Sequence, residues 1–463
     1  MPYRTYSADT IAAVATPLGQ GGIGIIRLSG PQAREIAERL FVPKKPGNAL
    51  QDRRLVLGNL VDPSTGAVLD EVLLSLMAAP FSYTREDVVE INSHSGPVLL
   101  SKILQLSLQA GARLADPGEF TFRAFMNGRI DLTQAEAVAD LIRSGSERGL
   151  TLAARQLAGG FAAEIEKLRG RSLDLLARVE AAIDFPEEVD PIGGSAESRS
   201  LEEDLLAPVE RLIAAHKQRK IWMEGIPTVI VGRVNAGKSS LLNRLLNEER
   251  ALVTPIPGTT RDVVESTIHL DGIPLRLMDT AGFRKGRGRI EHLGIQRTEE
   301  RLSGADLALV VIDRSRPLSG DDRDLLARTG ESRSLIVLNK SDLPSRIGRN
   351  AEALMRKERR VVETSALTGS GIEELRRAIV EMVVLDAEEE DLLHVAPNLR
   401  QREGLIQAAS FFRNAARNLK ENLPLEIVAE DLHAGVDALG LIMGKGAPDE
   451  VLDRIFSEFC IGK

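Results

Sequence analysis

Several residue types and patterns are scarce in this sequence of 463 residues, and each scarcity excludes a class of protein. A single cysteine leaves no partner for an internal disulfide and fits a reducing cytoplasm, where we expect the protein to act. The longest apolar runs, such as residues 307–312, are far too short to span a bilayer, so we expect no membrane insertion. Residues 1–10 contain one arginine and no apolar core, so we expect no secretory signal peptide.

Positive charge is not in surplus either, because the formal net charge is −8. This argues against a chain coated with positive charge for nucleic acid, although a local basic patch is compatible with the total. Three tyrosines and one tryptophan leave few aromatic rings on which single-stranded bases could stack. The hydrophobic content of 43% and the charged content of 27% are typical of a globular protein, and the length predicts about two to four domains.

Residues 232–240 carry the strongest motif in the chain, since they fit the phosphate-binding pattern G-x-x-x-x-G-K-[ST]. An apolar run at 228–231 precedes the motif and an expected helix at 240–246 follows it, which is the context that the motif requires. Glycine lets backbone N–H groups turn towards phosphates, and a helix N-terminus adds the positive end of its dipole. The motif predicts that Lys238 neutralises β- and γ-phosphate oxygens and that the Ser239 hydroxyl binds Mg²⁺. Asn235 adds a side-chain carbonyl that could bind a hard cation.

Three further motifs follow in the order that a GTPase requires, each after an expected strand. Residues 279–282 (Asp-Thr-Ala-Gly) place Asp279 at the Mg²⁺ site and the Gly282 N–H at the γ-phosphate. Residues 339–342 (Asn-Lys-Ser-Asp) place the Asp342 carboxylate where it accepts two hydrogen bonds from guanine, a pair that adenine does not offer. Residues 365–367 (Ser-Ala-Leu) resemble the loop whose N–H meets guanine O6. Together these motifs predict GTP binding.

The hydrolysis step is less clear from the residues alone. Many small GTPases carry a glutamine directly after this Asp-x-x-Gly motif to orient the attacking water, whereas this chain has Phe283. Hydrolysis therefore recruits another base and another cation, or the protein is a slow switch. Glu291 is a candidate base, and the candidate cations are Arg284, Arg287 and Arg289, which could equally be a solvated basic face.

The chain changes its pattern three times along its length. Residues 1–120 read as mixed α/β, with strands expected at 10–15, 23–28, 68–77 and 87–91 and helices at 31–40 and 95–110. Helical periodicity predicts helices at 132–142, 150–168, 173–183, 201–220, 399–419 and 427–442. Residues 221–384 alternate strand and helix, with strands expected at 228–231, 266–270, 275–278, 307–312, 335–338 and 361–363.

The predicted fold class is therefore a multidomain combination of α/β and all-α structure. We expect an N-terminal α+β domain (1–120), a helical bundle in two pieces (121–220 and 385–463), and a Ras-like, doubly wound P-loop domain inserted between them (221–384). Insertion is plausible because the chain termini of a domain often lie close together.

Further motifs make the whole chain resemble the MnmE (TrmE) family of tRNA modification GTPases. They are residues 10–13 (Thr-Ile-Ala-Ala), 21–27, 117–121 (Pro-Gly-Glu-Phe-Thr), 127–137, 258–262 (Gly-Thr-Thr-Arg-Asp) and the terminal Cys-Ile-Gly-Lys at 460–463. The resemblance implies a homodimer built through the N-terminal domain, with 5-formyl- or methylene-tetrahydrofolate at that interface as one-carbon donor. It also implies a flavoprotein partner, the FAD-dependent MnmG (GidA). The two would add a carboxymethylaminomethyl or aminomethyl group to C5 of the wobble uridine of tRNA.

The resemblance also implies potassium-stimulated GTP hydrolysis that accompanies pairing of the G domains. Glu291 and Lys238 would be the catalytic residues, with Glu291 positioning the water; Mg²⁺ would be held by Ser239, Thr260 and Asp279, and K⁺ by Asn235, Thr254, Ile256 and Thr259. The predicted GTP contacts are Asn235, Ala236, Gly237, Lys238, Ser239, Ser240, Thr254, Thr259, Thr260, Asp279, Thr280, Ala281, Gly282, Asn339, Lys340, Asp342, Ser365 and Ala366.

Folate contacts carry over to Arg27, Glu90, Arg129 and Lys463. Arginine and lysine suit the carboxylates of a glutamate-tailed folate, and a glutamate suits the N–H edge of the pterin. Cys460 either acts beside the folate or is a buried small hydrophobic residue. The sequence departs from the family pattern at Arg129, where some relatives carry lysine, and at Ser95 and Val234.

A regulatory GTP switch in ribosome assembly, similar to Era or Der, is the alternative function. The inserted domain alone does not separate the two, because those families share its loops. The residues that favour tRNA modification lie outside it, namely Arg27, Glu90, Arg129 and the terminal 460–463.

Overall fold

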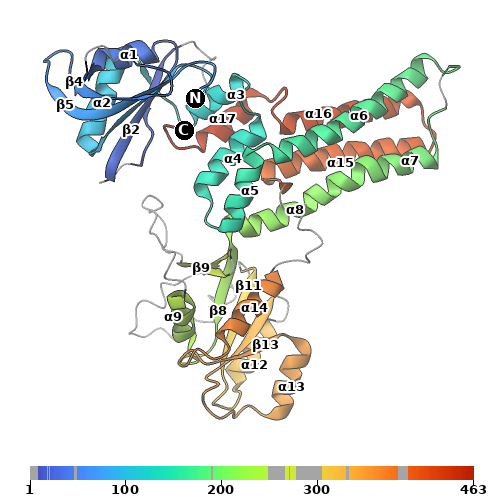
Figure 1. Cartoon of the computed structure of the whole chain (residues 1–463). Helices are drawn as coiled ribbons and strands as arrows, with labels where there is room; N and C mark the ends of the chain where they lie inside the picture. The colour runs from blue at the N-terminus through green and yellow to red at the C-terminus, as the bar shows by residue number, and fades with distance from the viewer. Residues whose placement is uncertain are drawn as a thin grey trace. The chain divides into compact units, whose positions relative to one another are not determined.

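The computed structural model describes residues 9–17, 19, 21–45, 50–188, 191–248, 266–270, 272–277, 305–329, 333–383 and 395–463 (Figure 1). The chain divides into two compact units. The first is formed by residues 1–139, 156–210 and 403–463, and the second by residues 140–155 and 211–402. Among the described residues, no helix is both long enough and apolar enough to span a membrane.

The first unit begins with a seven-stranded sheet of order β3-β4-β5-β6-β2-β1-β7. Its strands are β1 (Ile11–Val14), β2 (Gly21–Ser29), β3 (Phe41–Pro43), β4 (Leu55–Val61), β5 (Val68–Met77), β6 (Val88–Ser95) and β7 (Arg113–Leu114). Helices α1 (Ala33–Leu40) and α2 (Pro97–Gln109) pack on one face and share one apolar core with the sheet. The α+β prediction for this part is confirmed.

The sequence prediction of this sheet missed β3, β4 and β7. In β4 the exposed and buried positions are both apolar, with Leu55 64% exposed and Leu60 fully buried, so no alternation was visible. Helix α2 begins at Pro97, two residues after the predicted start, because Ser95 still pairs with Gly21 in the sheet. Proline suits the first helical position because its φ is already helical and its missing N–H is not needed there.

The rest of the first unit is helical. Among the described residues, six elements lie entirely within it: α3 (Glu119–Met126), α6 (Gly160–Asp184), α7 (Ser195–Leu201), a π-helical turn (Glu202–Leu206), α16 (Leu425–Ile442) and α17 (Asp449–Ser457). Four further helices have residues in both units: α4 (Leu132–Arg143), α5 (Glu147–Leu157), α8 (Ala207–Glu224) and α15 (Leu399–Lys420). Helix α16 packs along α6, so segments distant in sequence lie side by side (Figure 1). The predicted helical bundle, built from two separate pieces of the chain, is confirmed.

Two helix boundaries were predicted wrongly. The expected break between residues 168 and 173 is absent, because α6 runs without interruption and buries Ile165, Leu168 and Ser172 on one face. The break lies at Gly159 instead, where φ is 91° and only glycine is unstrained. Further along, the predicted helix 201–220 is part of a longer run from α7 through the π-helical turn to α8.

The second unit contains a six-stranded sheet of order β13-β12-β11-β8-β10-β9. Its strands are β8 (Ile226–Val231), β9 (Ser266–Leu270), β10 (Ile273–Leu277), β11 (Leu307–Asp313), β12 (Ser334–Asn339) and β13 (Val361–Thr364). All neighbours are parallel except β9, which forms an antiparallel hairpin with β10 at the edge.

Helices cover both faces of this sheet. Residues of α9 (Lys238–Glu248) and α14 (Ile372–Val383) join one core cluster, and residues of α12 (Gly320–Arg328) and α13 (Arg349–Glu358) join another. The two clusters divide the strand residues between them by alternation, as in a sheet buried on both faces. The doubly wound prediction is confirmed, and each predicted strand is present within a few residues. The domain boundaries that were predicted from the sequence stay predictions.

Candidate functional site

The phosphate loop leaves the end of β8 as a tight turn with left-handed backbone at three positions. The φ angles of Gly232, Asn235 and Gly237 are 153°, 66° and 95°. A Cβ on Gly237 would lie 2.1 Å from Nδ2 of Asn339, and one on Gly232 would lie 2.3 Å from the Val311 carbonyl oxygen. A side chain at either glycine would therefore push the loop off its strands. Glycine leaves this backbone free to approach a phosphate closely.

Lys238 and Ser239 stand in the first turn of α9, at the positive end of the helix dipole. The Lys238 ammonium donates hydrogen bonds to the carbonyls of Gly232 and Arg233, both at 2.7 Å, and is thereby held over the loop. Burial lowers the pKa of Lys238. Ser239 and Ser240 are exposed. A cation that has lost part of its water shell attracts a phosphate more strongly than one in bulk water, so this arrangement suits a polyphosphate.

A second loop follows β12 and is joined to the phosphate loop by one buried side chain. Asn339 donates from Nδ2 to the Ala236 carbonyl at 2.9 Å, and its Oδ1 accepts from the Ala366 N–H at 3.1 Å. Asp342 accepts a hydrogen bond from the Ser365 hydroxyl at 2.6 Å, and its carboxylate remains exposed. The predicted base-reading residues Asn339, Asp342, Ser365 and Ala366 are therefore brought together. They lie at the carboxyl edge of a parallel sheet, which is where such folds bind ligands.

The remaining predicted GTP and metal residues lie outside the described part of the chain. They are Thr254, Ile256, Thr259, Thr260, Asp279, Thr280, Ala281, Gly282 and Glu291. Phe283 and the arginines at 284, 287 and 289 also lie outside it.

A second cluster of predicted residues lies in the first unit, on the N-terminal sheet. Arg27 of β2 and Glu90 of β6 are register partners, and the Arg27 Nε and Nη2 atoms lie 2.9 and 2.8 Å from Glu90 Oε1. Their side chains are 17% and 22% exposed, so the pair is largely shielded from water. The Arg27 guanidinium also lies 5.7 Å from the ring centre of Phe120.

The C-terminal residues reach this pair. Arg27 Nη1 donates to the Gly462 carbonyl at 3.3 Å, and the Gly118 N–H donates to the Cys460 carbonyl at 3.4 Å. Burial, and then the charge of Arg27, lower the pKa of Lys463, while Glu90 acts in the opposite direction. Cys460 is exposed, so the reading of a buried hydrophobic cysteine is wrong.

Arg129 joins the cluster through a residue that the sequence did not single out, Tyr83. Its Nη1 donates to the Tyr83 carbonyl at 3.0 Å, and its guanidinium lies 4.8 Å from the Tyr83 ring centre. Burial raises the pKa of Tyr83, whereas a hydrogen bond with Thr121 and the charges of Arg129 and Arg27 lower it. Tyr83 therefore lies within electrostatic reach of both arginines.

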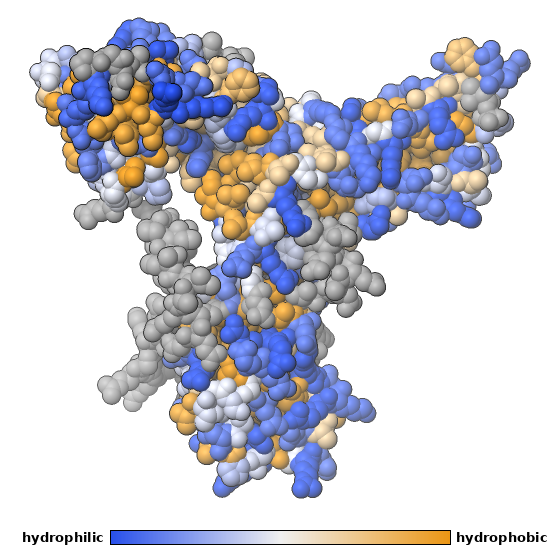
Figure 2. Space-filling view, viewed as in Figure 1, coloured by the Kyte–Doolittle hydropathy of each residue, from blue (hydrophilic) through white to orange (hydrophobic). Residues whose placement is uncertain are grey.

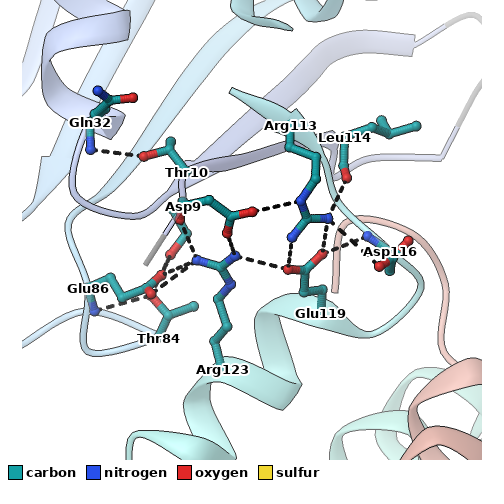
Figure 3. A network of polar contacts seen from close by, with 11 residues as sticks. Asp9, Thr10, Gln32, Thr84, Glu86, Arg113, Leu114, Asp116, Glu119 and Arg123 are labelled. Carbon is teal, nitrogen blue, oxygen red and sulfur yellow. Dashed lines mark hydrogen bonds and ion pairs between the residues drawn. The ribbon is translucent and has the colours of Figure 1, made fainter. Parts of the chain in front are cut away.

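A network of buried and partly buried charges ties Glu86, three residues after Tyr83, to helix α3 (Figure 3). Arg123, only 2% exposed, lies 2.6 Å from Asp9, 3.1 Å from Glu86 and 2.9 Å from Glu119. Arg113 lies 2.8 Å from Asp9 and 2.6 Å from Glu119, and hydrogen bonding to Glu119 raises its pKa. Removing one member of such a network leaves buried charge uncompensated. The network therefore fixes the geometry around the second cluster.

Sequence reasoning missed Tyr83 and Phe120 in the second cluster, and it missed Asp313, whose carboxylate accepts a hydrogen bond from Lys340 in the base-reading loop. Asp313 could have been found, because it is a polar residue that ends a buried strand in the same way as Asn339. Tyr83 and Phe120 belong to contacts between segments far apart in the chain, which no local pattern reveals.

A phosphate loop and a base-reading loop on one edge of a doubly wound sheet define a P-loop protein of the GTPase class. Comparison with known families identifies the rest of the chain. Residues 10–129 match the family described as GTP-binding protein TrmE N-terminus, and residues 132–460 match the MnmE helical domain.

Curated relatives match nearly the whole chain. Among those named tRNA modification GTPase MnmE, the protein of Chloroflexus aurantiacus is 47% identical over 461 residues, which cover 98% of this chain and 100% of that protein. The protein of Moorella thermoacetica is 46% identical over 467 residues, with 98% and 99% covered. That of Carboxydothermus hydrogenoformans is 43% identical over 459 residues, with the same coverage. The chain belongs to the MnmE (TrmE) family of tRNA modification GTPases.

Proposed function

We propose that this chain hydrolyses GTP to drive modification of the wobble uridine of tRNA, using a one-carbon unit carried by a folate. As a member of the MnmE family, the chain is a tRNA modification GTPase and thus a GTP hydrolase. The proposal that this activity uses a folate to modify the wobble uridine is supported by the presence of two separate polar clusters in one chain. One suits a guanine nucleotide, and the other suits an anionic ligand with an N–H edge.

In the nucleotide site, Lys238 holds the β- and γ-phosphates and the helix dipole of α9 adds to its field. Ser239, with Thr260 and Asp279, would hold Mg²⁺, which neutralises charge on the phosphates. Asn235 would hold K⁺ together with Thr254, Ile256 and Thr259. The exposed Asn235 side chain and the tight backbone of its loop fit such a role, because they leave an amide oxygen free beside the phosphates. Glu291 would orient the attacking water.

In the second cluster, Arg27, Arg129 and Lys463 would bind the carboxylates of a reduced folate, and Glu90 would accept hydrogen bonds from the pterin. The folate supplies the one-carbon unit when it is bound. The shielded Arg27–Glu90 pair supports this proposal, since two partly buried charges with further capacity for hydrogen bonds are ready to receive a polar ligand. Cys460 is exposed close to Lys463 and can reach such a ligand.

The proposed partners are a second copy of the chain, the flavoprotein MnmG and tRNA, all in the cytoplasm. The homodimer is supported by the outer face of the N-terminal sheet, where Leu55, Leu57 and Leu73 are 64%, 47% and 40% exposed. Leu57 and Leu73 are register partners, and Leu73 is next to Asn92, two residues from Glu90 on the same face. Figure 2 shows apolar side chains gathered at the surface of this part of the molecule. A face of this kind is suited to cover by a partner.

The experiment that tests the proposal compares a deletion strain with its parent. Mass spectrometry of tRNA nucleosides should show the loss of the C5-modified wobble uridine in the deletion strain, while ribosomal subunit profiles should be unchanged. Normal tRNA nucleosides together with accumulated ribosomal precursors would favour the alternative, a regulatory switch similar to Era or Der.

A further inference from the structure

Asp313 connects the end of strand β11 to the loop that reads the base. Asp313 and Asn339 are register partners at the carboxyl ends of two parallel strands. The Asp313 Oδ2 atom accepts a hydrogen bond from the Lys340 ammonium at 2.7 Å. The two side chains are 12% and 29% exposed, so water screens this pair less than an ordinary surface ion pair.

The carboxylate of Asp313 is itself held in one orientation. Its Oδ1 atom accepts hydrogen bonds from the backbone N–H and the hydroxyl of Ser315, at 3.0 and 2.6 Å. Burial alone would raise the pKa of Asp313, but the hydrogen bonds from Lys340 and Ser315 outweigh burial and lower it. The group therefore stays ionised. Arg316 also approaches Oδ2, at 3.6 Å, but its side chain is 64% exposed.

Lys340 is fixed at both ends. Its backbone has a φ of 66°, a left-handed conformation that is unusual for lysine, and the next N–H, that of Ser341, is tied to the Thr364 carbonyl at 2.9 Å. Its ammonium is tied to Asp313. A lysine held at both ends presents its methylene stem as an ordered apolar surface. This stem belongs to the loop that carries Asp342.

We propose that Asp313 is a positioning residue of the guanine site. It stretches the Lys340 side chain along the base-reading loop, so that the methylene stem forms a wall for one face of the purine ring before the nucleotide binds. A wall that is already ordered removes an entropy cost from binding. The inference rests on the proposed GTP function. Because GTP and GDP carry the same base, Asp313 acts equally on the affinity for both and does not act on the γ-phosphate step.

The test measures dissociation of a fluorescent GDP and the steady-state hydrolysis of GTP with the full-length chain. Asp313→Asn should raise the GDP dissociation rate and the KM for GTP about three- to tenfold, as expected for one partly shielded charge-assisted hydrogen bond, with kcat unchanged. Lys340→Met, which keeps the stem but removes the ammonium, should have a similar effect. In the double variant the Asp313 change should add nothing further, because Asp313 acts through the ammonium. Arg316→Gln removes the exposed partner of the same carboxylate and should behave as the parent protein.

Two results would overturn the inference. One is a parental dissociation rate in both Asp313→Asn and Lys340→Met, and the other is a full additional effect of Asp313→Asn in the Lys340→Met background. If Asp313→Asn does not fold, Ser315→Ala takes its place, because it removes the hydroxyl that orients the Asp313 carboxylate; it should weaken GDP binding in the same direction, and a parental dissociation rate in both Ser315→Ala and Lys340→Met would overturn the inference. Asp342→Asn distinguishes a failure of the proposed function: it should lose GTP and gain xanthosine triphosphate. If it binds GTP as the parent does, the guanine site itself is wrongly assigned.

Discussion

Asn339 donates a hydrogen bond to the carbonyl of Ala236 at 2.9 Å, so the last residue of β12, which begins the base-reading loop, also holds the phosphate loop. The two loops are 103 residues apart in the sequence, yet one buried amide fixes their spacing. A nucleotide that contacts both loops therefore binds a site in which their spacing is already fixed. The phosphate loop and the base-reading loop are coupled through this one contact.

Replacing Asn339 with alanine should separate the two halves. The change leaves the Ala236 carbonyl and the Ala366 N–H without their partner, and we expect a loss of about 1–3 kcal/mol of stability together with at least about tenfold weaker GTP binding. Fluorescent-nucleotide titration and urea unfolding measure the two effects. Leu343→Ala, at a 44% exposed position of the same loop, is the control and should change neither. Parental GTP affinity in Asn339→Ala would show that GTP binding does not depend on the bond between the two loops.

Gly462 gives a sharp test of the C-terminal part of the folate cluster. Its φ is 92°, and a Cβ there would lie 2.3 Å from the Val14 carbonyl oxygen. Gly462→Ala should displace the C-terminus from Arg27, and calorimetry with 5-formyltetrahydrofolate should show binding at least about tenfold weaker, the loss typical of a charge-assisted contact. Ile461→Ala, at a 53% exposed position, should bind as the parent. An unchanged affinity in Gly462→Ala would remove the C-terminus from the site.

Hydrolysis should depend on potassium, because Phe283 cannot orient water and the phosphate loop offers Asn235 to a cation. We expect GTP turnover to be far faster in KCl than in NaCl at matched ionic strength, and Asn235→Ala should abolish the difference. Glu291→Ala should slow turnover by about 10²–10⁴-fold, the usual loss of a general base, with GTP affinity nearly unchanged. Equal rates in the two salts would show that the cation is not K⁺, and the arginines at 284, 287 and 289 would then be the candidate cations.

The network around Arg123 should dominate the stability of the N-terminal region. Arg123→Met removes the buried cation that Asp9, Glu86 and Glu119 share and leaves Glu119 with Arg113 alone, and breaking such a buried pair typically costs about 3–5 kcal/mol. Arg34→Met removes an exposed pair with Glu38 and should cost at most about 0.5 kcal/mol. Urea unfolding of the two variants gives the comparison. Equal midpoints would show that the buried network contributes no more than a surface pair.

Much of the nucleotide domain was predictable because its chemistry is local. The glycines at 232 and 237, the lysine and the hydroxyl lie within one loop and one helical turn, so spacing alone identifies them. The second cluster is different, since Arg27 meets Gly462 across 435 residues and only a family resemblance brought them together beforehand. Asp313 lies between these cases: its position at the end of a buried strand is readable from the sequence, but its bond to Lys340 is not.

The helix boundaries failed for another reason. Gly159 and Gly170 look alike in the sequence, but Gly159 has left-handed backbone and ends a helix, while Gly170 lies inside α6. The difference arises from packing, because the Gln134 side chain donates to the Leu157 carbonyl at 2.9 Å and satisfies the end of α5. Local propensity contains no information about such a partner.

A reconstitution with purified components tests whether GTP hydrolysis by this chain drives the tRNA modification. The chain, MnmG, unmodified tRNA, a reduced folate carrying a one-carbon unit, and GTP are combined, and the wobble nucleoside is quantified by mass spectrometry. We expect a C5-modified uridine that forms with GTP, and that does not form with a non-hydrolysable GTP analogue or with the Asp342→Asn variant. Formation of the modified nucleoside at the same rate without GTP hydrolysis would show that hydrolysis does not drive the modification.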